Sequence, residues 1–136
     1  MATQSILYVG ARLISAIILL QTLFFKFTAS PESVYIFSVV GMEPWGRISV
    51  GILELIAGLL LVVGATAWLG GLLALSLMAG ALFMHATKLG ISVQGDGGYL
   101  FYLALAVSLC SLYVVVRNKE QILKIAKWIR SFAWRK

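Results

Sequence analysis

The chain has 136 residues, of which 61% are hydrophobic and only 12% are charged. An average soluble domain has about 25% charged residues, so this composition excludes an ordinary soluble domain and predicts a single membrane domain. The one cysteine, Cys110, excludes an intramolecular disulfide and a cysteine-based zinc site. The one histidine, His85, excludes a bis-histidine haem within the chain. We therefore expect no metal site and no required cofactor.

The net charge of +6 is concentrated at the end of the chain. Residues 117–136 contain seven basic residues and one acid, whereas residues 1–116 contain four of each. A basic segment that follows a hydrophobic one is typical of contact with anionic lipid headgroups. The charge distribution therefore predicts membrane lipid as a partner and no nucleic acid.

Four apolar runs, at about residues 6–28, 45–63, 68–89 and 99–116, are long enough to cross a bilayer as helices. The runs lack the alternation of membrane strands, and a barrel would need at least about eight of them. We therefore predict an all-α membrane protein whose residues 1–116 form an antiparallel bundle of four transmembrane helices. The first run has no basic residue before it and is long for a signal-peptide core, so we expect it to be a retained helix.

Two further helices are predicted outside the spans. Ser30 followed by Pro31 is a helix start signal and Gly41 is a stop signal, which predicts a short interfacial helix over about 31–40. Residues 117–136 repeat apolar side chains with helical spacing, which predicts a basic amphipathic helix on a membrane surface, with a disordered basic anchor as the alternative. The surface-contacting residues of this tail would be Lys124, Lys127, Trp128, Arg130 and Trp134.

The orientation in the membrane follows from the basic residues. Because Lys and Arg are enriched in cytoplasmic segments, the basic tail is expected in the cytoplasm. Four spans then place the N-terminus on the same side. The interfacial helix at about 31–40 would face the extracytoplasmic side.

Ionisable side chains within the spans need partners, because each costs roughly 2.5–3.5 kcal/mol to insert at mid-bilayer. Glu54 lies near the middle of the second span, and depth along the helices predicts a pair with Arg12 from below, with His85 or a down-reaching Lys26 as partners from above. Such a pair can be purely structural and fix the helix register. We also predict a polar cavity in the outer half of the bundle, lined by Arg12, Lys26, Arg47, Glu54, His85, Tyr99 and Tyr102.

Three segments, "ARLISAIILLQTLFFKF", "VVGMEPWG" and "ELIAGLLLVVG", resemble the DoxX family of membrane proteins in their order and spacing. The family's early Arg, its Phe-x-Lys-Phe and its Glu match Arg12, Lys26 with its flanking Phe residues, and Glu54. Members often have Thr-Arg after the second helix, whereas here Thr66 is followed by Ala67. The resemblance implies a multi-pass protein of the bacterial inner membrane. The fold also resembles sterol-isomerase-like four-helix proteins, which bind lipids within the membrane.

The functions expected from these features fall into two classes. The first is a non-enzymatic binding or assembly module whose cavity around Glu54 takes a lipid, a quinone or a partner helix. The alternative is a subunit of a quinone-linked oxidoreductase or a sterol-isomerase-like enzyme. That enzyme would use Glu54 as acid or base, assisted by His85 or a tyrosine. A proton pathway ranks last, since one central carboxylate gives too few relay groups. A homodimer or a complex with another membrane protein is left open by the sequence.

Overall fold

The computed structural model describes residues 2–134, so Met1 and the predicted tail residues Arg135 and Lys136 lie outside the described part. Residues 2–134 are helical apart from short turns and contain no strand. The elements in chain order are α1 (Ala2–Phe27), α2 (Pro31–Val40), α3 (Trp45–Val62), the 3-10 turn η1 (Gly64–Thr66), α4 (Ala67–Met84), the π-helical turn η2 (His85–Leu89), α5 (Tyr99–Arg117) and α6 (Lys119–Ala133). This confirms the predicted all-helical class.

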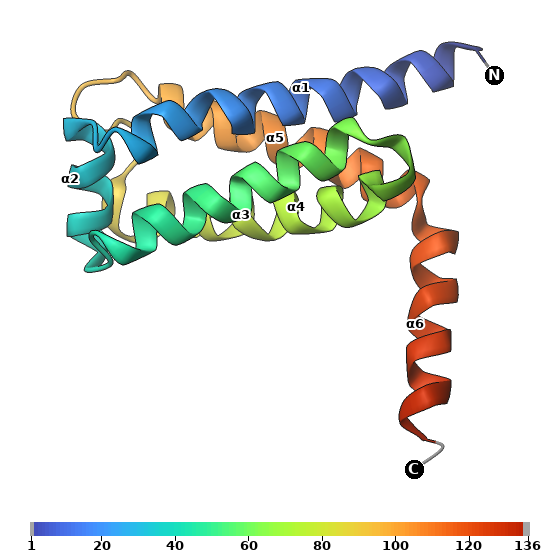
Figure 1. The fold of residues 1–136 in the computed structure, drawn as a ribbon. Helices are drawn as coiled ribbons and strands as arrows, with labels where there is room; N and C mark the ends of the chain where they lie inside the picture. The colour runs from blue at the N-terminus through green and yellow to red at the C-terminus, as the bar shows by residue number, and fades with distance from the viewer. Residues whose placement is uncertain (1, 135–136) are drawn as a thin grey trace.

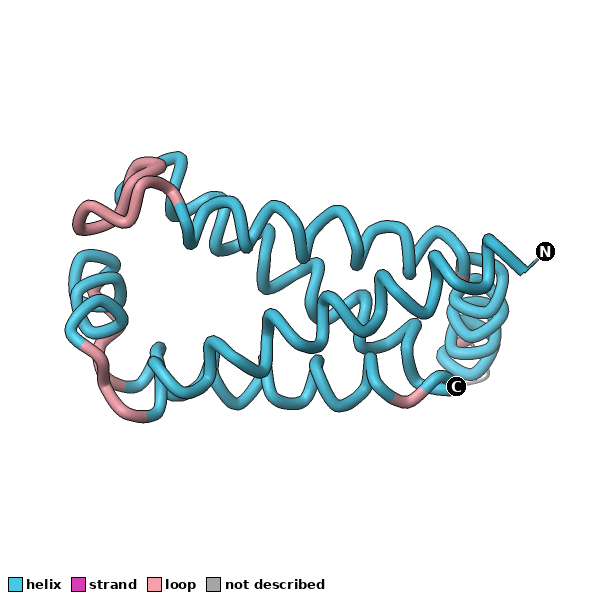
Figure 2. Tube along the Cα trace, turned by 90° about the horizontal axis from the view of Figure 1, so that it is seen from above, coloured by secondary structure: helices cyan, strands magenta, loops and turns pink. Residues whose placement is uncertain are grey.

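The four long helices form a bundle in which neighbours pack side by side (Figures 1 and 2). α1 packs against α3 and α5, and α4 packs against the same two helices, while α1 and α4 barely touch. Four segments (Ser5–Phe27, Trp45–Val62, Gly64–Leu89 and Tyr99–Arg117) are long and apolar enough to cross a membrane. The chain therefore has the form of a multi-pass membrane protein, as predicted.

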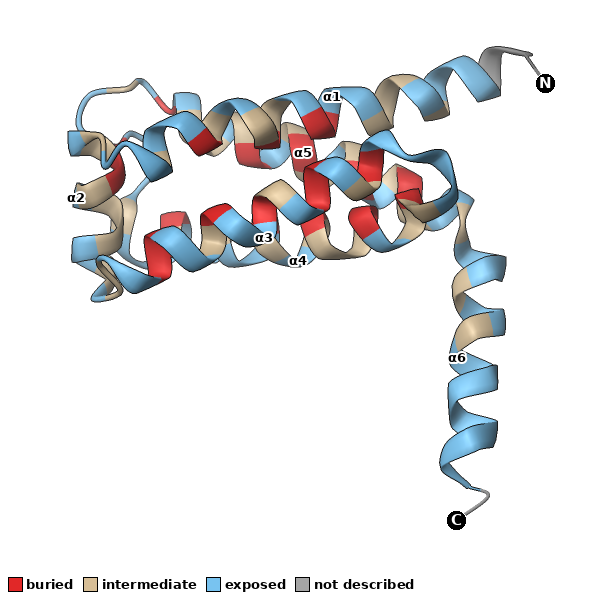
Figure 3. Cartoon of the chain, viewed as in Figure 1, coloured by how far each residue is buried: buried red, intermediate tan, exposed pale blue. Residues whose placement is uncertain are grey.

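The outer surface of the bundle is apolar. Large side chains such as Ile6, Phe24 and Leu109 are 61–70% exposed. In a soluble protein so much exposed apolar area would mark an interaction surface. On four helices of membrane-spanning length, the same apolar area is the surface that faces lipid tails. Figure 3 shows that the buried residues gather on the inner faces of the helices instead.

The half of the bundle near η1 is closely packed around small residues. Ala16, Ala57 and Ala74 are fully or almost fully buried there. α4 comes very close to α3 at Gly70, because a Cβ added to this residue would lie 2.7 Å from the backbone nitrogen of Leu61 in α3. Small residues at such contacts let the backbones of membrane helices come close together, and the resulting van der Waals packing stabilises the helix pair.

At the other end of the bundle, α2 lies across the ends of the long helices (Figure 1). Its bounds are those predicted from the sequence. The Ser30 hydroxyl accepts a hydrogen bond from the backbone N–H of Ser33, and Gly41 ends the helix with φ of 80°, the left-handed conformation that glycine tolerates.

The loop before α5 is organised by Asp96. Its carboxylate accepts hydrogen bonds from the backbone N–H groups of Val93, Gly98 and Leu100 at 2.8, 2.8 and 3.0 Å. Partial burial acts to raise the pKa of this carboxyl, but the three N–H donors and the Ser92 side chain together outweigh burial and hold its pKa below the ordinary value. The loop is thereby fixed against the start of α5.

We predict that Gly70→Ala destabilises the protein because the added methyl group would push against the α3 backbone. Overpacking of this kind costs about 1–3 kcal/mol, which thermal unfolding in detergent micelles would detect as a lower melting temperature. Gly80→Ala in the same helix is the matched control, since a Cβ at Gly80 meets nothing within 4 Å. Equal melting temperatures for the two variants would contradict the close α3–α4 packing.

Candidate functional site

A pocket lies in the half of the bundle that α2 covers. Its volume is about 470 Å³, and α1, α2, α3, α4 with η2, and α5 all contribute to its wall. Most of the lining side chains are apolar. The polar and ionisable side chains that line it are Gln21, Thr22, Lys26, Ser30, Glu32, Ser33, Glu54, Ser76, His85 and Tyr99.

Lys26 and Glu54 form an ion pair that bridges α1 and α3 beside this pocket. Lys26 Nζ lies 2.9 Å from Glu54 Oε2, and the two side chains are only 15% and 5% exposed. The hydroxyl of Thr22 lies 3.2 Å from the same carboxylate oxygen and 2.8 Å from the carbonyl oxygen of Leu19. Gly51 leaves room for the ring of Phe27 next to Lys26, since an added Cβ would lie 3.0 Å from Phe27 Cε1. The Lys26 side chain therefore extends along its own helix toward the bundle centre. This is the down-reaching Lys26 that the sequence offered as an alternative partner for Glu54.

The predicted pair of Arg12 with Glu54 is not formed. Arg12 instead donates from Nε to the carbonyl oxygen of Leu61 at 2.9 Å and from Nη2 to that of Val62 at 2.7 Å. Leu61 follows Glu54 by seven residues, which is ~11 Å along a helix. The arginine therefore lies about two turns away from the carboxylate. It satisfies carbonyl groups that the end of α3 leaves without helical partners, where a cation is also favoured by the helix dipole.

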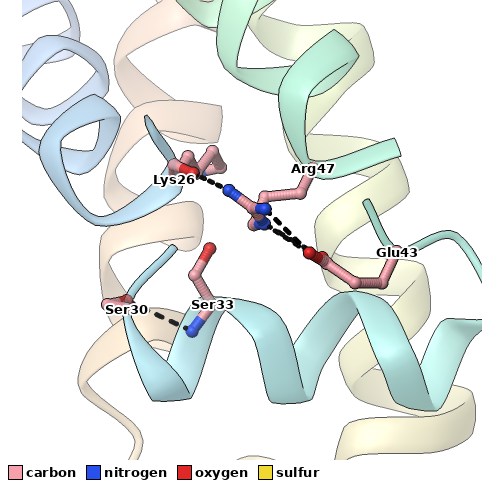
Figure 4. Close-up of polar contacts among 5 residues, drawn as sticks. All are labelled: Lys26, Ser30, Ser33, Glu43 and Arg47. Atoms are coloured by element: carbon pink, nitrogen blue, oxygen red, sulfur yellow. Dashed lines mark hydrogen bonds and ion pairs between the residues drawn. The ribbon is translucent and has the colours of Figure 1, made fainter. Parts of the chain in front are cut away.

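Arg47 links the end of α1 to the start of α3, at the other end of this helix pair from Arg12. Its guanidinium binds the Glu43 carboxylate through Nε and Nη2 at 2.7–2.9 Å, and its Nη1 donates to the backbone carbonyl of Lys26 (Figure 4). The side chain is almost fully buried. Arg47 thus satisfies a carbonyl group at the end of α1 and does not line the pocket.

His85 begins the π-helical turn and is 7% exposed. Its Nδ1 lies 2.7 Å from the carbonyl oxygen of Gly90. A carbonyl oxygen only accepts, so Nδ1 carries the hydrogen and, in the neutral ring, Nε2 is the acceptor. The ring packs edge-on against Phe101, with 5.6 Å between centroids. His85 is thus fixed in orientation while it lines the pocket wall.

Of the seven residues predicted to line a cavity, the structure brings four to this pocket: Lys26, Glu54, His85 and Tyr99. Arg12, Arg47 and Tyr102 are not among the residues that line it: the two arginines cap helix ends, and Tyr102 is 59% exposed with its ring against Phe101. The sequence reasoning missed Ser33, a buried hydroxyl on α2. Its helical spacing from Ser30 and Phe37 would have placed it on the inner face of α2.

The burial of the Lys26–Glu54 pair leads to a prediction about the stability of the protein. Lys26→Met leaves the Glu54 carboxylate uncompensated, and breaking a buried pair in this way costs about 3–5 kcal/mol. Glu54→Gln should cost less, because the long lysine can turn its ammonium group toward the nearby helix end. The double variant Lys26→Met/Glu54→Gln should recover much of the loss.

Thermal unfolding of the four proteins forms a double-mutant cycle, with Lys88→Met as the control, since Lys88 is exposed on η2. Additive losses from the two single changes would rule out an energetic coupling between these side chains.

Comparison of the chain with family models, with curated proteins and with solved structures gives no match. The resemblance to the DoxX family therefore stays a prediction.

Proposed function

We propose that the protein is a non-enzymatic binding or assembly module that takes a lipid, a quinone or a partner helix into the pocket at the α2 end. The pocket volume of about 470 Å³ carries this proposal. Small-molecule sites have volumes of about 300–1,000 Å³, with apolar walls and a few fixed polar groups. Lys26, Glu54 and His85 are such fixed groups.

The ion pair favours an uncharged ligand. Lys26 and Glu54 neutralise each other, so this part of the wall has no net charge. An anionic or cationic ligand group would need to compete with a partner that is already 2.9 Å away. An uncharged polar group needs only hydrogen bonds, which His85 Nε2 and the Ser33 hydroxyl can offer.

The same contacts favour binding over acid–base catalysis. Glu54 is engaged by Lys26 and lies within hydrogen-bond distance of Thr22, so it is not a free base. The enzyme alternatives, a quinone-linked oxidoreductase subunit or an isomerase, would need this carboxylate to exchange protons with a substrate. We further propose that the protein is a DoxX-like protein of a bacterial inner membrane. In an assembly role, its partner would be a second copy of the chain or another membrane protein.

We predict that a lipid or quinone copurifies with the protein and that filling the pocket removes it. Ala81 lines the pocket and Ala79, two residues earlier in α4, is exposed and does not. Ala81→Phe should lower the amount of bound ligand, measured by mass spectrometry, by about tenfold, which corresponds to ~1.4 kcal/mol. Ala79→Phe should leave it unchanged.

Both variants must elute as folded protein and melt cooperatively for this comparison. Equal ligand content in the two would show that the copurifying molecule sits elsewhere. Glu54→Gln tests the catalytic alternative in the same preparations. Turnover of a quinol or sterol by the parent protein that disappears in Glu54→Gln would overturn the non-enzymatic proposal.

We also propose that the bundle is antiparallel, with both termini in the cytoplasm and α2 on the extracytoplasmic side. The support is the excess of basic residues after α5. A reporter that is active only in the cytoplasm, fused after Lys136, should be active, and one fused into the loop near Gly95 should be inactive. The reverse pattern would show that the protein is inserted the other way round.

A further inference from the structure

The last helix, α6, stands apart from the bundle. Figure 1 shows it leaving the end of α5 at a steep angle, and Figure 2, turned by 90°, shows it end-on beside the bundle. It has no buried residue, and no other element packs extensively against it. Because α6 runs sideways from the end of the bundle and not along it (Figure 1), it would lie parallel to the surface of a bilayer that the bundle spans.

The turn between α5 and α6 is fixed by Asn118. Its side-chain amide donates one hydrogen to the Tyr8 hydroxyl at 2.8 Å and the other to the Val114 carbonyl oxygen at 2.7 Å. Tyr8 lies on α1, so this contact ties the turn to a second helix of the bundle. The start of α6 is therefore tied to the bundle by a specific contact between residues 110 positions apart.

The two faces of α6 differ strongly. One face carries only apolar side chains: Ile122, Ile125, Ala126, Ile129, Phe132 and Ala133. Within α6, the two residues with partial cover are Ile122 and Ile125, both on this face, while Ile129 and Phe132 are 56% and 66% exposed. A monomeric helix in water would leave this apolar face without a partner.

The other face is basic. Lys124, Lys127 and Arg130 are exposed on it. The acidic residue of α6, Glu120, lies in the first turn of the helix. Trp128 and Trp134 are 65% and 86% exposed. Basic residues opposite a wide apolar face, together with tryptophan, are the composition of helices that lie in the headgroup region of anionic bilayers.

We infer that α6 is a binding site for an anionic leaflet, with its apolar face in the acyl boundary and its lysines and arginine among the headgroup phosphates. Charge complementarity and the position of α6 at the end of the bundle (Figure 1) support this occupant over a protein partner. The inference does not depend on what the pocket binds, nor on which side of the membrane the tail lies.

The test uses the full chain with Cys110→Ser and a single introduced cysteine carrying a spin label. Ile129→Cys places the label on the apolar face, and Ser131→Cys is the matched control on the polar face, with no change in charge. The labelled proteins are placed in nanodiscs of phosphatidylcholine alone or mixed with phosphatidylglycerol. Relaxation by dissolved oxygen and by an aqueous nickel chelate then measures immersion of each label.

In the anionic discs we expect the label at 129 to be relaxed by oxygen and protected from the chelate, and the label at 131 to be exposed to the chelate. Protection at 129 should be weaker in phosphatidylcholine alone. It should also weaken in the anionic discs after Lys124→Gln/Lys127→Gln/Arg130→Gln, or at about 1 M salt, where charges are screened beyond ~3 Å.

Three results would overturn the inference. Equal chelate exposure of the two labels in anionic discs would show that α6 does not enter the headgroup region. Equal protection at 129 in both kinds of disc would show apolar contact without recognition of anionic lipid. Spin–spin coupling between labels at 129 in discs that hold two copies would assign the apolar face to a second copy of the chain.

Discussion

The contact of α1 with α3 is the constraint on which the rest of the bundle depends, because three cationic side chains secure it at three depths. Arg12 binds the last carbonyl groups of α3, Lys26 pairs with Glu54 in the interior, and Arg47 reaches from the start of α3 to the end of α1. Each cation is costly in an apolar medium, so each must keep its partner. Sliding α1 along α3 by one turn would break all three contacts at once, which makes the register of this helix pair unique.

The other helix contacts depend on size rather than on charge. α4 approaches α3 at Gly70 and α5 at Gly71, where an added Cβ would lie 3.1 Å from Val114. The hydroxyls of Ser15 and Ser111 meet between α1 and α5 at 3.4 Å. These small residues close the half of the bundle near η1. Toward α2 the lining side chains do not fill the interior, and the pocket results from this change in packing along the bundle axis.

Much of the secondary structure was predictable from local chemistry. The bounds of α2 followed from Ser30, Pro31 and Gly41, because caps act on their own neighbours. The target of Arg12 was not predictable in the same way. Its acceptors are backbone carbonyl groups, which no residue pattern identifies, and the relative shift of two helices decides which of them it reaches. The Arg47–Glu43 pair could have been found, since residues four apart face each other on a helix, although Glu43 lies just before α3.

The length of α5 links the proposed role of α6, at one end of the bundle, to that of the pocket, at the other end. α5 separates the Asn118 turn from Tyr99 by 19 residues, or about 28 Å, which is close to the ~30 Å thickness of the hydrocarbon core. With α6 held at one headgroup region, Tyr99 and α2 then reach the opposite one. The Lys26–Glu54 pair lies near the middle of the bilayer under this arrangement, because Glu54 is close to the midpoint of α3. Water is scarce there and an ion pair is held most firmly. A helix that fixes the depth of the bundle would therefore also fix the depth at which the pocket meets the lipid tails.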